Sequence, residues 1–180
     1  IEPQGRSLNI YADNGVGKTR LANAFAWLLW GKDSQERPDS GKGAFDVLPL
    51  DSSGSRIKEV TEASVEAVLE LENGQQVTLK RIFSEKWTKK RNNPISEMTG
   101  TETKYEIDGV KGLTETRYKA FIASLVPKIR DDRDPTGHMK PETVWKTLSN
   151  PLAFNDDKVL PWEQRRGILS EFSGNIPDAQ

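Results

Sequence analysis

The 180-residue sequence contains no cysteine and only one histidine, His138. Without cysteine, disulfides, thiolate metal sites and cysteine nucleophiles are excluded. One histidine leaves little for imidazole-based metal binding. No apolar run reaches the ~18 residues that a membrane span needs. Positive and negative charges nearly cancel, with 26 Lys and Arg against 27 Asp and Glu, so a strongly basic nucleic-acid-binding domain is also excluded. Any contact with DNA must come from a local patch.

The first residue is Ile1 rather than an initiator methionine. We therefore expect the sequence to be an excerpt, with part of its core supplied by segments outside it. Together with the missing apolar runs, the composition predicts a soluble, cytoplasmic protein without a membrane partner.

The first zone, residues 7–31, reads as a strand, a glycine-containing loop and a helix. The helix is predicted over residues 19–30 and is apolar on nearly every side, which is typical of a helix buried on most sides. Gly31 is the expected end of this helix. Residues 32–62 are polar and rich in loop-forming residues, so we expect a surface excursion with one short strand near Val47 and Leu48.

Residues 63–110 read as antiparallel strands, because apolar and polar residues alternate in 65–72 and again in 77–83. The turn between the two runs decides their register. A two-residue turn at Asn73-Gly74 would set apolar residues opposite polar ones. A three-residue loop, Glu72-Asn73-Gly74 with Gly74 left-handed, would pair Leu69 with Val77 and Ala67 with Leu79 on one apolar face. We predict the three-residue loop.

One further strand and several helices are predicted in the rest of the chain. A third strand is expected over residues 101–107, after a basic and mobile connection at 85–98. In the helical zone 111–180, the spacing of five apolar residues predicts an amphipathic helix that Pro127 ends; they are Tyr118, Phe121, Ile122, Leu125 and Val126. A charged loop (128–140), a short helix (143–148) and a helix over 162–172 that follows Pro161 complete the prediction.

The motif around Lys18 carries the strongest functional signal. The phosphate-binding loop pattern G-x-x-x-x-G-K-[ST] matches at seven of its eight positions in Ala12-Asp13-Asn14-Gly15-Val16-Gly17-Lys18-Thr19. Only the first glycine is missing, and Ala12 stands in its place. A predicted strand before the motif and a long helix after it make a chance match a weak alternative.

The chemistry of this loop explains its residue types. Gly15 and Gly17 let backbone N–H groups turn inward around a phosphate, and the helix N-terminus adds partial positive charge. Lys18 places an ammonium group on the β- and γ-phosphates, and the Thr19 hydroxyl is a ligand for Mg²⁺. We therefore predict that residues 13–20 bind ATP with Mg²⁺; they are Asp13, Asn14, Gly15, Val16, Gly17, Lys18, Thr19 and Arg20. Lys18 is the catalytic candidate.

The form of the motif, with Asn14 before Gly15, resembles that of ABC-type and SMC-type ATPases. The longer runs 10–19 and 24–34 resemble the N-terminal half of SbcC-like, SMC-related ATPase heads, above all those of phages and bacteria. Further segments fit the same resemblance: 49–51, 79–83, 85–91, 150–155 and 162–169.

The resemblance implies a P-loop NTPase of the α/β class: the N-terminal lobe of an ABC/SMC-type head, with an antiparallel β subdomain and a helical flank that leads towards a coiled coil. It implies that the C-terminal half of the same ATPase completes the head and that two heads form a homodimer around ATP. Duplex DNA and an SbcD-type nuclease subunit are the implied further partners. The location would be the nucleoid in a bacterium or the host cytoplasm for a phage.

Several expected motifs are absent from the sequence. There is no Walker B segment, no Ser-Gly-Gly-like signature motif and no coiled-coil heptad pattern. We therefore expect residues 1–180 to be one partial ATPase domain that alone binds nucleotide weakly and hydrolyses it poorly. The family's Q-loop glutamine is also missing. Asn155 is the candidate substitute as a Mg²⁺-sensing amide, and a plain turn residue is an equal alternative.

A basic cluster with a tryptophan in its midst is the candidate DNA contact; its charged members are Lys86, Lys89, Lys90 and Arg91. Such a cluster would bind phosphates without sequence preference and with strong salt dependence. A solvated loop is the alternative. For the whole chain, we predict an ATPase that serves DNA repair, recombination or phage DNA metabolism. The alternatives are a P-loop NTPase of another class, such as a small-molecule kinase, and a binding module that nucleotide merely orders.

Overall fold

The computed structural model describes residues 10–11, 13, 17–57, 59–71, 73–89, 96–131, 134–149, 157 and 160–172. The chain forms two compact units, Ile1–Lys119 and Ala120–Gln180.

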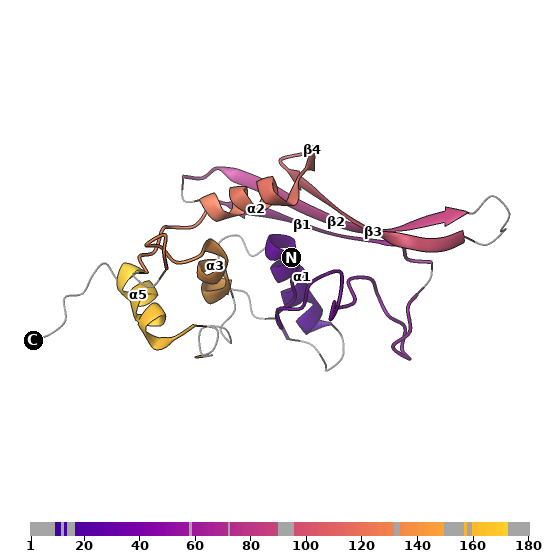
Figure 1. Cartoon of the computed structure of the whole chain (residues 1–180), viewed down its shortest axis with the longest axis horizontal. Coiled ribbons are helices and arrows are strands. Elements are labelled where there is room, and N and C mark those ends of the chain that lie inside the picture. Colours follow the sequence, from indigo (N-terminus) through magenta and orange to yellow (C-terminus); the bar gives the residue numbers. More distant parts are fainter. Residues whose placement is uncertain are drawn as a thin grey trace, which may run out of the picture. The chain divides into compact units, whose positions relative to one another are not determined.

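The first unit combines one helix with a four-stranded sheet, an α/β arrangement (Figure 1). Its elements are α1 (Lys18–Trp30), β1 (Glu62–Glu70), β2 (Gln76–Lys89), β3 (Ser96–Ile107) and β4 (Val110–Leu113). Helix α2 (Glu115–Ser124) carries the chain from the first unit into the second, where α3 (Pro141–Ser149) and α5 (Trp162–Phe172) follow.

The sheet is an antiparallel meander in the order β1-β2-β3-β4. The predicted register of its first hairpin is confirmed, because Leu69 pairs with Val77 and Ala67 pairs with Leu79. Gly74 has a φ of 78°, as a left-handed residue in a three-residue loop requires. The odd-numbered side chains of β2 from Val77 to Phe83 are buried, so this part of one sheet face belongs to the core.

Two features of the sheet differ from the sequence prediction. Residues 85–89 and 96–98, expected in a mobile connection, continue strands β2 and β3. They can do so because each strand pairs with the other beyond the end of β1. We call residues 85–89 and 96–101 the hairpin arm; Figure 1 shows it extending past β1. The short strand β4 was also not predicted. It follows a tight turn at Asp108 and Gly109, whose φ values are both positive, as in the preferred two-residue hairpin turn.

Helix α1 is confirmed at both ends, apart from one added residue at its start. Gly31 ends it with a φ of 75°, and the Gly31 N–H donates to the Trp27 carbonyl over 2.9 Å. The expectation of burial on most sides is wrong for the first half. The buried residues of α1 are only Trp27, Leu28, Leu29 and Trp30, whereas Leu21 is 42% exposed. Residues 18–22 are exposed and residues 23–26 are partly buried, so the described residues cover the first half of α1 only in part.

The core of the first unit joins α1 to the sheet. Trp27 of α1, Leu48 of the following loop and Phe83 of β2 form a buried cluster. The loop residues near Val47 contribute to this cluster without forming the expected strand, since the described part of 32–61 holds isolated bridges only. Packing, rather than strand pairing, thus fixes this loop.

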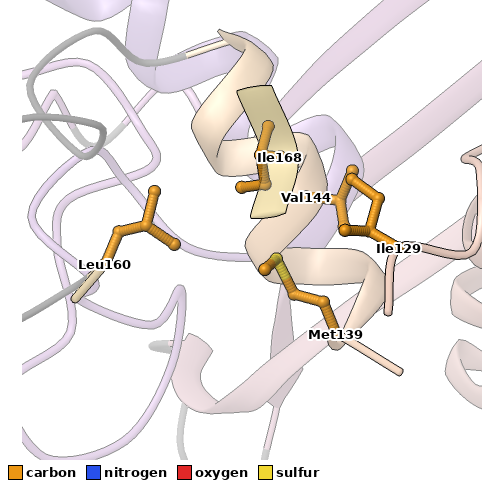
Figure 2. Packing of buried hydrophobic residues seen from close by; sticks show 5 residues of the cluster. All are labelled: Ile129, Met139, Val144, Leu160 and Ile168. Carbon is orange, nitrogen blue, oxygen red and sulfur yellow. The ribbon is translucent and has the colours of Figure 1, made fainter. Parts of the chain in front are cut away.

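The second unit is built on a small apolar cluster. Figure 2 shows its five buried side chains, which are Ile129, Met139, Val144, Leu160 and Ile168. Helices α3 and α5 agree with the predicted segments, and α5 begins after Pro161 as expected. Helix α2 is shorter than predicted because it ends at Ser124, before Leu125 and Val126. The described residues of 128–140 form a loop, as expected, but Ile129 and Met139 near its two ends are core residues.

Candidate functional site

The described end of the predicted phosphate loop lies at the start of α1. Gly17 has a φ of 100° and precedes the helix without a side-chain cap. The Lys18 ammonium donates to the Asp13 carbonyl over 2.8 Å. This contact joins the side chain of Lys18 to the backbone of Asp13. Lys18 is thereby held at the helix start, as a phosphate-binding lysine requires.

The first turn of α1 is electropositive. Its N–H groups have no partner within the helix, and the helix dipole adds partial positive charge there. The turn contains no acidic residue, and Lys18 and Arg20 add two full charges. Lys18, Thr19 and Arg20 are all exposed. The site can therefore accept an anionic group, with the Thr19 hydroxyl available as an oxygen ligand beside it.

Several predicted residues lie outside the described part of the chain. They are Asn14, Gly15 and Val16 of the loop, Asn155, and the basic residues Lys90 and Arg91. Most of the predicted strand 7–12 also lies outside it, and the two described residues Ile10 and Tyr11 form no strand. The predicted roles of all these residues stay predictions.

The described part of the basic cluster lies on the hairpin arm. Lys86 and Lys89 are exposed in β2, and Lys86 forms an ion pair of 3.5 Å with Glu102. Trp87 is 43% exposed, and its indole N–H donates to Glu85 over 2.9 Å. The arm therefore presents an aromatic ring and two lysines to solvent, with carboxylates beside them.

Arg37, in the loop after α1, pairs with Asp33. Its guanidinium lies 2.6 Å from the Asp33 carboxylate, and its backbone N–H also donates to Asp33. Burial of Asp33 opposes ionisation, but hydrogen bonds from Arg37 and Gln35 outweigh it and lower the pKa of this carboxyl. The Asp33–Arg37 pair thus organises the turn after α1 and is not directed at a ligand.

The acidic loop of the second unit is not a cation site in its described residues. Asp131 is buried and accepts a hydrogen bond of 2.7 Å from Gln164, while Asp134 caps a turn through Thr136. More widely, the described residues contain no group of three or more histidine, cysteine or acidic side chains that could hold a metal ion. None of the described helices is long and apolar enough to cross a membrane.

Sequence reasoning missed Arg81 of β2, a buried cation with a side chain that is 1% exposed. The signal was available, because Arg81 continues the odd-numbered series Val77, Leu79 and Phe83, which faces the core. A charged residue on the buried side of a strand needs compensation from its surroundings.

Comparison with known proteins gives the family. No curated protein matches the chain. A family model described as an AAA domain matches residues 1–135, which is more than half of the chain and includes the whole phosphate loop and the sheet. The chain therefore belongs to the AAA domain family of nucleotide-binding ATPase modules, which generally use ATP with Mg²⁺.

Proposed function

We propose that the chain is the N-terminal half of an SMC/SbcC-like ATPase head and that it binds ATP with Mg²⁺ at the start of α1. One observation carries the nucleotide site. Lys18 and Thr19 occupy the first turn of a helix that follows a left-handed glycine, and this turn is exposed and free of acidic residues.

Each residue has a stated role in this proposal. The backbone N–H groups of residues 13–19 surround the terminal phosphates, and Lys18 moves from the Asp13 carbonyl to the β- and γ-phosphates. The Thr19 hydroxyl would be a ligand of Mg²⁺, and Asn155 is the candidate amide for the same ion. Mg²⁺ would neutralise charge on the phosphates.

The uncovered first half of α1 supports a second half of the head. Leu21 is a large apolar side chain that is 42% exposed, and Ala22 beside it is exposed as well. An apolar helix surface of this kind is stable when another segment packs on it. We assign this role to the C-terminal half of the same ATPase, which would also supply the Walker B and signature motifs. Two such heads would then form a dimer around ATP.

The hairpin arm supports a role in DNA metabolism. Lys86 and Lys89 are exposed on it, and Trp87 adds a ring that can lie against a sugar or a base. Together with Lys90 and Arg91, the arm would contact the phosphates of duplex DNA. ATP-driven engagement of two heads would then act on DNA during repair, recombination or phage DNA metabolism, with or without an SbcD-type nuclease subunit.

The test is ATP hydrolysis with and without the C-terminal half that the natural gene encodes. The chain alone should hydrolyse ATP slowly, and adding the second half should raise the rate at least about tenfold, because it supplies groups that stabilise transition-state charge. Lys18→Ala should abolish this gain. Lys111→Ala, which removes an exposed lysine from β4, is the matched control and should leave the rate unchanged.

Two outcomes would favour other functions. ATP binding that never leads to hydrolysis, even with the second half present, would indicate a module that nucleotide merely orders. Transfer of phosphate to a small molecule rather than to water would indicate a kinase.

A further inference from the structure

A second candidate binding site lies at the other end of α1. Helix α1 has 13 residues and is therefore about 20 Å long, so its C-terminal end is well separated from the phosphate loop. A pocket of about 450 Å³ opens there; its lining includes Trp30, Ser40, Arg81, Thr101, Thr103 and Tyr105. All of these residues belong to the first unit.

The guanidinium of Arg81 is surrounded mainly by aromatic rings. Its central carbon lies 4.9 Å from the Tyr105 ring centre, 5.5 Å from that of Tyr118 and 5.7 Å from that of Trp27. Ring faces attract a cation but accept N–H groups poorly. Burial raises the pKa of Tyr118 to about 12, so its hydroxyl stays protonated and donates to the Leu28 carbonyl over 3.0 Å.

The hydrogen bonds of Arg81 are incomplete. Its nearest carboxylate, on Asp39, is 3.9 Å away and already accepts a hydrogen bond of 2.9 Å from the Trp27 indole. Nε and Nη2 of Arg81 are buried and have no acceptor among the described residues. Burial lowers the pKa of Arg81, which indicates that its surroundings compensate its charge only in part.

Trp30 adds a second incomplete donor to the same pocket. Its side chain is buried, and its indole Nε1 has no acceptor among the described residues. Indole and guanidinium N–H groups can only donate hydrogen bonds. Buried donors of this kind normally have partners, but the Trp30 indole and these two Arg81 nitrogens have none among the described residues. The hydroxyl groups of Ser40, Thr101 and Thr103 line the same space and can also donate.

The charges of the lining match an anion. Two lysines and two acidic residues of the lining balance each other: Lys32, Lys119, Asp39 and Glu115. Lys119 and Glu115 form an ion pair of 2.6 Å. Arg81 is therefore the excess charge of the lining, and one negative charge would neutralise it.

We propose that this pocket binds an oxyanion, a phosphate or carboxylate group of a small ligand, which accepts hydrogen bonds from Arg81 and Trp30. The planar guanidinium suits both groups because it offers parallel N–H donors to two oxygens. The pocket is larger than one such group, and its hydroxyl-bearing strand β3 provides further contacts for the rest of the ligand. This site involves none of the residues of the phosphate loop, so its test is independent of the test of the proposed ATP site.

The test uses the 180-residue chain with Lys18→Ala, which removes phosphate binding at the start of α1. Inorganic phosphate and succinate are added in separate titrations, and the indole N–H signal of Trp30 is followed by NMR and assigned with Trp30→Phe. A saturable shift with either anion is expected, and the anion that produces it identifies the ligand group. The indole signal of exposed Trp162 should not move.

Variants then test the named donors. Arg81→Gln should weaken binding at least about tenfold, as expected for the loss of a charge-assisted hydrogen bond. Arg81→Lys keeps the charge, loses the parallel donors and should weaken binding as well. Lys80→Gln, on the opposite face of the same strand, is the control and should change affinity less than about twofold, because Lys80 pairs with Glu66 outside the pocket.

Three results would overturn the proposal: no saturable shift with either anion, equal shifts of the Trp30 and Trp162 signals, or unchanged affinity in folded Arg81 variants. If neither Arg81 variant folds, calorimetric titration of Trp30→Phe decides the question, since this variant keeps a ring and loses the N–H donor. Unchanged anion affinity in Trp30→Phe would then contradict the proposal.

Discussion

Gly31 meets two requirements at one residue. It ends α1 in the left-handed region, with a φ of 75°, where glycine is favoured. A Cβ atom at this position would also clash with Nη1 of Arg81. The sequence predicted the first role, because glycine after an apolar helix is a stop signal. It could not predict the second, because the close approach of Arg81 depends on the packing of β2 against the end of α1.

We predict that Gly31→Ala destabilises the protein more than an equivalent change elsewhere. The matched control is Gly43→Ala, since Gly43 has a φ of 76° and open space around its Cβ position. Gly43→Ala should cost about 1 kcal/mol of unfolding free energy from backbone strain alone. Gly31→Ala should cost about 1–3 kcal/mol more, because the added methyl group displaces a packed side chain.

Urea unfolding of both variants and the wild type measures this difference. Equal losses of stability in the two variants would mean that Arg81 does not pack against Gly31. The account of the oxyanion pocket would then lose its geometric basis.

At the scale of elements, the β1–β2 hairpin was the most predictable part of the fold. Alternation of apolar and polar residues fixed its faces, and the mismatch produced by a two-residue turn fixed its loop. Strand β4 and the hairpin arm escaped prediction for a physical reason. Both are held by pairing with β3 rather than by an apolar pattern of their own, since the arm residues 86–89 and 96–99 are all exposed.

The hairpin arm gives a prediction about DNA. Charge reversal by Lys89→Glu, Lys90→Glu and Arg91→Glu should weaken binding to duplex DNA and flatten the dependence of the binding constant on salt. The slope of log K against log salt concentration is negative. Three lost phosphate contacts should reduce its magnitude by about 2–3. Lys111→Glu, which reverses an exposed lysine of β4, is the control for a charge reversal away from the arm.

Fluorescence anisotropy with a labelled duplex at several salt concentrations measures both quantities. If the triple variant binds with the wild-type slope, the arm is not the DNA contact. In that case the lysines serve only to keep the exposed arm soluble.

At the scale of the whole molecule, the sequence predicted the ATPase family better than it predicted burial. The phosphate-loop motif is local, so its residues could be found without a structure, and Lys18 indeed begins α1. Burial of α1 is not local. Its apolar sequence predicted cover on most sides, but within the described part of the chain only its last four residues, Trp27 to Trp30, are buried. The exposed half is consistent with the proposal that a second half of the ATPase packs there.

The affinity of the chain for ATP in the presence of Mg²⁺, compared between the wild type and Lys18→Ala, tests the central claim most directly. Isothermal titration should show binding of ATP to the wild type, with affinity at least about tenfold weaker in Lys18→Ala because a charge-assisted contact to the phosphates is lost. Lys111→Ala should bind as the wild type does. Equal affinity in the wild type and Lys18→Ala, or no binding of ATP to the wild type at all, would contradict the account.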